Sequence, residues 1–126
     1  MLTFGLFCSA QEHKEVDSVL NIWIKKFNTK KYDELYQLHT SFYRSKMPLE
    51  QMVKNLEMVR DMMGVLKSAK FVAYKNQVYT YLVFAKENHV VADVNIVYHP
   101  SDKAFQYLAF NRIGGTDDPP PAAIKQ

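Results

Sequence analysis

The chain has few of the residues that identify an enzyme or a cofactor-binding protein by motif. It contains one cysteine, Cys8. If the chain is cut after Ala10, the mature protein has none, which excludes a disulfide framework, a thiol nucleophile and thiolate metal ligands together. Its four glycines form no phosphate-binding loop and no nucleophile elbow, and we expect no cofactor.

An excess of one charge and long apolar runs are also lacking. The formal net charge is only +3, whereas nucleic-acid-binding domains concentrate a larger positive excess on one surface, so we expect no nucleic-acid partner. No apolar run approaches the roughly 20 residues that cross a bilayer, and we expect no membrane span. What is present is an average globular composition, 48% hydrophobic over 126 residues, which suffices for one compact domain.

The two ends differ from the rest of the chain. Residues 1–10 form an apolar run that closes on small residues before the polar Gln11, which resembles the end of a secretory signal without its basic start. We therefore expect a truncated signal segment and an exported protein, periplasmic or secreted; lipid attachment at Cys8 and a buried N-terminal segment are the alternatives. Residues 114–126, with three consecutive prolines, predict a flexible tail, which leaves a single domain over 11–113.

Helical periodicity dominates the first half of the chain. Apolar residues at spacings of three and four predict a first helix over 16–27. A short second helix is expected over 32–39. The third helix is predicted with Ser45 as its cap, Pro48 in its first turn and Gly64 as its stop.

After Gly64 the hydrophobic period changes from that of a helix to that of a strand. The strands are expected at residues 65–75, 78–86, 89–99 and 104–113, with turns at 76–77, 87–88 and 100–103. Such short connections join antiparallel neighbours. The sequence therefore predicts an antiparallel meander of four strands.

The turn lengths also predict which residues face each other. They place Tyr81 opposite Val94, Ile96 opposite both Tyr79 and Tyr107, Tyr98 opposite Phe105, and His99 opposite Ala104. One face of the sheet is then apolar apart from phenol hydroxyls and Asn111; it comprises Tyr79, Tyr81, Val83, Val90, Ala92, Val94, Ile96, Tyr98, Phe105, Tyr107, Ala109 and Ile113. The other face is partly wet, with Thr80, Asp93, Asn95, His99, Gln106 and Arg112 among Leu82, Phe84, Leu108 and Phe110.

Three helices followed by this meander predict an α+β half-cone, with the helices packed into the concave side of a curved sheet. Trp23 and Phe27, together with residues 31–36, 59–64 and 67–68, make the chain resemble the nuclear transport factor 2-like, or cystatin-like, superfamily, in particular its small exported bacterial domains of unknown function. The resemblance covers about residues 14–113. It implies a cone-shaped cavity and leaves open what the cavity does, because isomerases, dehydratases, ligand binders and interaction modules share this scaffold.

The aromatic surplus indicates where a ligand would lie. We expect a small apolar ligand, or a protein partner, to bind within a cavity lined by Trp23, Tyr36, Tyr43, Tyr79, Tyr81 and Tyr107. Buried phenols need hydrogen-bond partners, which favours water, a ligand or a partner on the inner face. The alternative is that these rings only fill the core, as methionines 47, 52, 58, 62 and 63 are expected to do around the third helix.

Catalysis has little support in the sequence. An isomerase or dehydratase would need an acid or a histidine with a partner inside the cone. Asp93 is expected on the opposite face, as a structural partner of Arg112, and His39 is expected to be a partly exposed structural residue. The four histidines are not expected two or four residues from one another or from an acidic ligand on the same element, and we expect no metal site.

Two surface features remain. Lysines 25, 26, 30 and 31 surround the end of the first helix, where the helix dipole repels anions, so a solvated helix end is favoured over an anion site. The wet sheet face carries Leu82, Phe84, Leu108 and Phe110, more apolar surface than a free face needs. We therefore keep a homodimer formed through this face as a further alternative.

Overall fold

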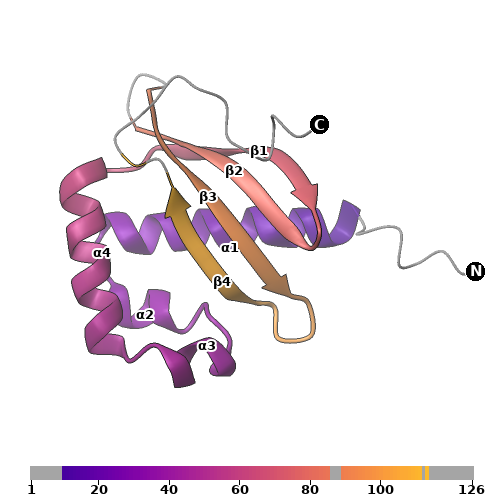
Figure 1. Ribbon diagram of the computed structural model, residues 1–126, viewed down its shortest axis with the longest axis horizontal. Helices are drawn as coiled ribbons and strands as arrows, with labels where there is room; N and C mark the ends of the chain where they lie inside the picture. The colour runs from indigo at the N-terminus through magenta and orange to yellow at the C-terminus, as the bar shows by residue number, and fades with distance from the viewer. Residues whose placement is uncertain (1–9, 86–88, 112, 114–126) are drawn as a thin grey trace, which may run out of the picture.

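The computed structural model describes residues 10–85, 89–111 and 113, and shows an α+β fold with an open four-stranded antiparallel sheet (Figure 1). The expected signal segment, except Ala10, the expected tail, and the turn at 87–88 lie outside the described residues. The helices are α1 (Ala10–Asn28), α2 (Tyr32–Tyr36), α3 (Ser41–Lys46) and α4 (Leu49–Met63). The strands are β1 (Ser68–Lys75), β2 (Val78–Phe84), β3 (Val90–His99) and β4 (Ala104–Asn111), in that order across the sheet.

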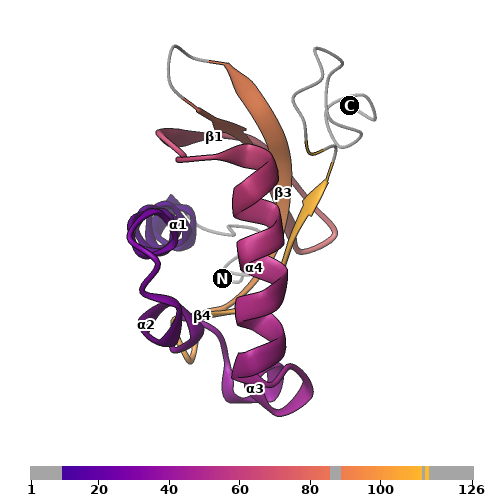
Figure 2. The same cartoon turned by 90° about the vertical axis from the view of Figure 1, so that its left-hand side faces the viewer.

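Helix α1 packs across one face of the sheet, and α4 runs along one side of the sheet (Figures 1 and 2). The apolar stripe of α1 is buried as its spacing predicts, at Val16, Leu20, Trp23, Ile24 and Phe27. The helix begins at Ala10, well before the expected start near Val16. This extra length adds two polar turns whose side chains reach the sheet. No helix in the described part of the chain is long and apolar enough to cross a membrane.

The middle of the chain forms two short helices where one was expected. Helix α2 stops at Tyr36, and Thr40 then caps α3 by accepting a hydrogen bond from the Tyr43 amide at 3.1 Å. Ser45 lies inside α3 rather than at the cap of α4, and Pro48 immediately precedes α4. Gly64 ends α4 with a φ of 79°, a conformation that glycine adopts at little cost.

The methionines around α4 divide between the core and the surface. Met52 and Met63 are buried, and Met47 is half-buried. Met58 and Met62 are exposed, so the prediction that all five fill the core was wrong for these two. They lie on the face of α4 that points away from the sheet, where gap filling is not needed.

The register of the central strands agrees with the prediction as far as Val83. Beyond it a bulge places Phe84 opposite Val90, so the expected inner position of Val90 was wrong and Val91 is the buried residue. Tyr79 lies opposite Ile96 and Tyr81 opposite Val94, while at the other hairpin Tyr98 lies opposite Phe105. The two-residue turn between β1 and β2 is also confirmed: Asn76 and Gln77 have φ values of 52° and 69°, as in the turn type whose twist matches that of paired strands.

A β-bulge in β4 overturns the predicted faces of that strand. The register shifts between Val97 and Tyr98, so Gln106 is an extra residue in β4 and Ile96 faces Leu108 instead of Tyr107. Every later residue of β4 therefore changes face. Tyr107 is 49% exposed, and the residues that turn inward are Leu108 and Phe110, with Phe110 packed against Trp23 at a ring-centroid distance of 5.6 Å.

The same bulge changes the sheet face that suggested a homodimer. Leu108 and Phe110 leave that face, so half of the apolar residues counted on it are absent. Asn111 arrives there opposite Asp93, instead of lying on the inner face. Asp93 itself is buried, at 1% exposure, although its face was expected to be wet, and its expected partner Arg112 lies outside the described residues.

A clamp of polar contacts joins the end of α1 to α4 and to the start of the sheet. The Arg60 guanidinium donates to the backbone carbonyls of Phe27 and Asn28, each at 2.9 Å. The Asn28 side chain donates to the Leu66 carbonyl at 2.7 Å and accepts from the Leu66 amide at 2.9 Å. The clamp thereby satisfies carbonyls that a helix end leaves without partners.

Candidate functional site

A cavity of about 180 Å³ lies between α4 and β4, and we call it the α4–β4 cavity. Trp23 of α1 and Leu108 and Phe110 of β4 line it, and the chain around α3 contributes further walls. Its remaining lining residues are His39, Tyr43, Met47, Met52, Asn55, Leu56, Val59 and Ile113. Most of these side chains are apolar. Asn55 contributes a side-chain amide and His39 an imidazole. The bulge in β4 builds one wall, since it turns Leu108 and Phe110 inward.

Trp23 is held in this wall by His39. The indole Nε1–H donates a hydrogen bond to His39 Nε2 at 3.1 Å, and the His39 ring stacks on Tyr43 with centroids 4.2 Å apart. Backbone pairing fixes the histidine, because the Phe105 amide donates to the Leu38 carbonyl and the Phe105 carbonyl accepts from the Thr40 amide, both at 2.9 Å. His39 is only 1% exposed, so the expectation of a partly exposed residue was wrong, whereas a structural role agrees with these contacts.

The protonation state of His39 follows from this environment. Burial lowers the pKa of the imidazole to about 4; the Phe105 backbone acts in the opposite direction and the charge of Arg44 adds to the lowering. The ring is therefore neutral at pH 7. Because Nε2 accepts from the indole, its lone pair is occupied and the ring proton sits on Nδ1. His39 thus positions Trp23 and has no free lone pair at Nε2 for proton abstraction.

Of the six aromatic residues expected at the ligand site, the structure brings two to the cavity wall, Trp23 and Tyr43. Tyr36 supports the rim from behind, since its hydroxyl lies 2.7 Å from the Met47 carbonyl and 3.0 Å from the Arg44 carbonyl. Tyr79 and Tyr81 lie elsewhere on the inner face, and Tyr107 is on the outer face. Sequence reasoning missed Leu108 and Phe110 because it did not include the bulge.

The buried phenols of the sheet find their partners on α1. The Tyr79 hydroxyl lies 2.6 Å from Glu12, that of Tyr81 lies 2.5 Å from Asp17, and that of Tyr98 lies 3.0 Å from Glu15, all as donors to carboxylate oxygens. The pKa of Tyr81 and that of Tyr98 are both raised. Burial is the larger cause, and the hydrogen bond from each phenol to its carboxylate partner on α1 is the second. These hydroxyls therefore do not require a ligand, contrary to the expectation from the sequence.

One of these pairs yields a stability prediction. Replacing Tyr81 by Phe removes the donor to Asp17 while keeping the buried ring, and should lower the free energy of unfolding by about 1–2 kcal/mol, as for a hydrogen bond to a charged group that is partly solvated. Urea unfolding measures the change. Tyr107→Phe is the matched control, because its exposed hydroxyl should contribute less than about 0.5 kcal/mol. An equal loss in the two variants would contradict the role given to Asp17.

A second hollow, of about 330 Å³, lies between α1 and β1. His13, Asp17 and Lys70 are among its lining residues, and His13 Nε2 lies 3.4 Å from Asp17 Oδ1. The expectation that no histidine has an acid four residues away on the same element was therefore wrong, because α1 begins at Ala10 and holds both His13 and Asp17. Within the described residues no three His, Cys, Asp or Glu side chains gather as a metal site would need.

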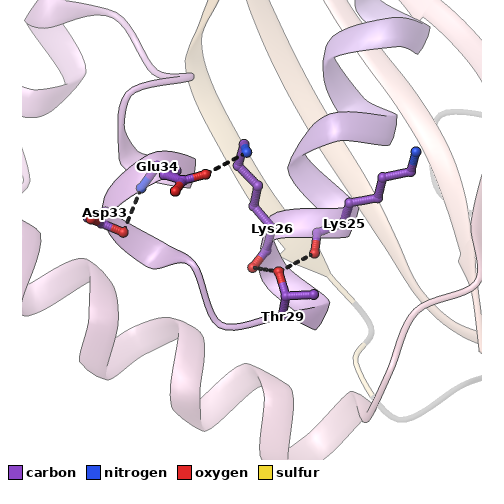
Figure 3. A network of polar contacts seen from close by, with 5 residues as sticks. All are labelled: Lys25, Lys26, Thr29, Asp33 and Glu34. Atoms are coloured by element: carbon purple, nitrogen blue, oxygen red, sulfur yellow. Dashed lines mark hydrogen bonds and ion pairs between the residues drawn. The ribbon is translucent and has the colours of Figure 1, made fainter.

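Figure 3 shows the end of α1, with Lys25 and Lys26 among its polar contacts. Lys26 Nζ pairs with Glu34 Oε1 at 2.8 Å, and this contact lowers the pKa of Glu34. Asp33 in turn accepts from the Glu34 amide at 2.9 Å, and the Thr29 hydroxyl donates to the Lys25 carbonyl at 2.8 Å. These contacts join the end of α1 to α2 through Lys26 and Glu34.

The chain was compared with known proteins in three ways. No family model matches it, and neither the curated proteins nor the solved structures contain a significant match.

Proposed function

We propose that the protein is a non-catalytic ligand-binding domain of the nuclear transport factor 2-like type, which takes a small apolar molecule into the α4–β4 cavity. The observation that carries the proposal is the cavity itself, whose walls combine Trp23, Leu108 and Phe110 with apolar side chains of α4. Small-molecule sites are typically concave and mostly apolar, with few polar groups that orient the guest. Asn55 supplies such a group here.

The volume limits the ligand class. A cavity of roughly 150 Å³ with apolar walls is known to accept benzene, so about 180 Å³ suits a single aromatic ring or a compact aliphatic group with one small substituent. A neutral His39 at pH 7 adds no charge to the wall, so the site favours an uncharged guest over an anion or a cation. One polar substituent could face Asn55.

Toluene binding tests the proposal directly. Trp23 is the sole tryptophan and lines the cavity, so its fluorescence should change on titration with toluene, with a Kd of about 0.1–1 mM, which corresponds to roughly −5 kcal/mol for a ligand of this size. Val59→Phe places a larger side chain in the cavity wall and should weaken binding at least about tenfold, because the guest and the new ring compete for one space.

The matched control is Met58→Phe, on the same helix but pointing to solvent at 58% exposure. It should bind toluene as the wild type does. The ligand-binding proposal is wrong if wild-type Trp23 fluorescence is unchanged up to the solubility limit of toluene, or if both variants weaken binding equally.

A further inference from the structure

Helix α3 and the first turn of α4 lie at one end of the molecule (Figures 1 and 2). This end carries exposed apolar side chains. We call residues 41–49 the α3 tip. Phe42 is 58% exposed and Leu49 is 37% exposed, while α3 itself buries none of its residues. Exposed apolar side chains rimmed by polar ones are typical of an interaction surface, and Phe42 with Leu49 supplies the apolar part of such a surface at this end of the molecule.

Basic side chains surround this apolar group. Lys46 Nζ lies 5.6 Å from the centroid of the Phe42 ring. Arg44 donates to the His39 carbonyl at 3.3 Å and to the Gln37 side chain at 3.0 Å, so its guanidinium lies against the connection between α2 and α3, next to the tip. Between residues 37 and 55 the charged residues are Arg44, Lys46 and Lys54 against the single acid Glu50. The tip therefore combines apolar exposure with a local positive excess.

We infer that the α3 tip docks on an anionic lipid surface. A peripheral membrane contact needs an aromatic or leucine side chain that enters the interface and flanking Lys or Arg side chains that meet anionic headgroups. Phe42 and Leu49 meet the first need, and Lys46 and Arg44 the second. The positive excess favours this partner over a second copy of the chain, whose tip carries the same charge.

The tip is continuous with the cavity wall. Tyr43 and Met47, which belong to the tip, also line the α4–β4 cavity. If the proposed ligand binding is correct, docking brings one end of the cavity close to the apolar layer in which such ligands dissolve. The docking itself does not depend on ligand binding, because it rests on the outward-facing side chains of the tip.

Sedimentation with vesicles tests the docking in the absence of added ligand. The intact protein should bind vesicles of equimolar phosphatidylcholine and phosphatidylglycerol, and bind pure phosphatidylcholine weakly. Phe42→Ser should reduce binding about tenfold through lost apolar burial, and Lys46→Gln about fivefold through one lost basic charge. Higher ionic strength should weaken the wild type more than Lys46→Gln.

Two further variants separate the possible outcomes. Met58→Ser removes an equally exposed apolar side chain outside the tip and should leave vesicle binding unchanged. Val59→Phe, which fills the cavity, should also bind vesicles normally, so failure of ligand binding and failure of docking are distinguishable. Absence of binding to the anionic vesicles, equal losses in Phe42→Ser and Met58→Ser, or self-association abolished by Phe42→Ser without vesicle binding would each overturn the inference.

Discussion

Acidification from pH 6.5 to pH 4 should lower the free energy of unfolding by about 3 kcal/mol through His39 alone. Burial lowers the pKa of His39 from 6.5 to about 4 in the folded protein. Between these two values the unfolded chain binds a proton that the folded protein does not, and stability falls as pH decreases. Above about pH 7.5 both states are neutral at this residue, so its contribution is constant there.

The variant His39→Gln isolates this contribution from the carboxylates that also titrate in acid. Its stability at pH 7 should be lower, because the Trp23 indole loses its imidazole acceptor, but the difference from the wild type should shrink as pH falls toward 4. Urea unfolding at several pH values, followed by Trp23 fluorescence, measures both effects. Met58→Gln, an exposed substitution that involves no titratable group, is the control and should keep the wild-type pH dependence. A constant difference between His39→Gln and the wild type across this range would contradict the prediction.

The elements that sequence reasoning predicted best are those with one strong periodicity. The stripe from Val16 to Phe27 and the alternation in β2 and β3 each distinguish a buried face from a polar one, so the fold class and the central register could be predicted. In β4 this contrast is missing. Phe105, Tyr107, Leu108 and Phe110 put apolar side chains on both faces, and a shift by one residue leaves no trace in the hydrophobic pattern.

The early turns of α1 were missed for a related reason. Their inward-facing residues are Glu12, Glu15 and Asp17, which pack against phenol hydroxyls rather than aliphatic side chains. A pattern based on hydrophobicity assigns carboxylates to solvent, and nothing near them in sequence reveals tyrosines more than sixty residues away. Here the partner of each buried phenol is set by tertiary packing alone.

The candidate site could be predicted only in part, because it contains both a polar side chain that is buried by tertiary contacts and residues of β4, whose register the hydrophobic pattern does not determine. Trp23 and Tyr43 could be named from the sequence because large aromatic residues on an amphipathic helix or beside it favour a core position. His39 could not be placed, since a polar ring becomes buried only when a distant donor satisfies it, and that donor is Trp23 on another helix. The cavity wall formed by Leu108 and Phe110 of β4 depends on the bulge at Gln106, and no turn residue or proline nearby in the sequence predicts that bulge.

Replacing Asn28 by Ala should lower the free energy of unfolding by about 2–4 kcal/mol. Leu66 is buried, and the change leaves both its amide and its carbonyl without the partner that Asn28 provides. Each buried backbone group left without a hydrogen bond costs about 1–3 kcal/mol. Asn21→Ala, an exposed asparagine on the same helix, should change stability by less than about 0.5 kcal/mol.

Arg60→Met extends this test to the other half of the clamp. It removes the donor to the carbonyls of Phe27 and Asn28 but keeps an unbranched apolar side chain beside the Phe27 ring. Because Arg60 and Asn28 hold the same helix end, the double variant should lose less stability than the two single losses added together, with a coupling of about 0.5–2 kcal/mol. Additive losses would show that the two residues act independently and that α4 does not secure the end of α1 through this clamp. A working clamp also fixes Trp23, which lies one turn before the end of α1, so the clamp variants should weaken toluene binding as well as lower stability. If the two residues act independently, the toluene affinity should stay unchanged.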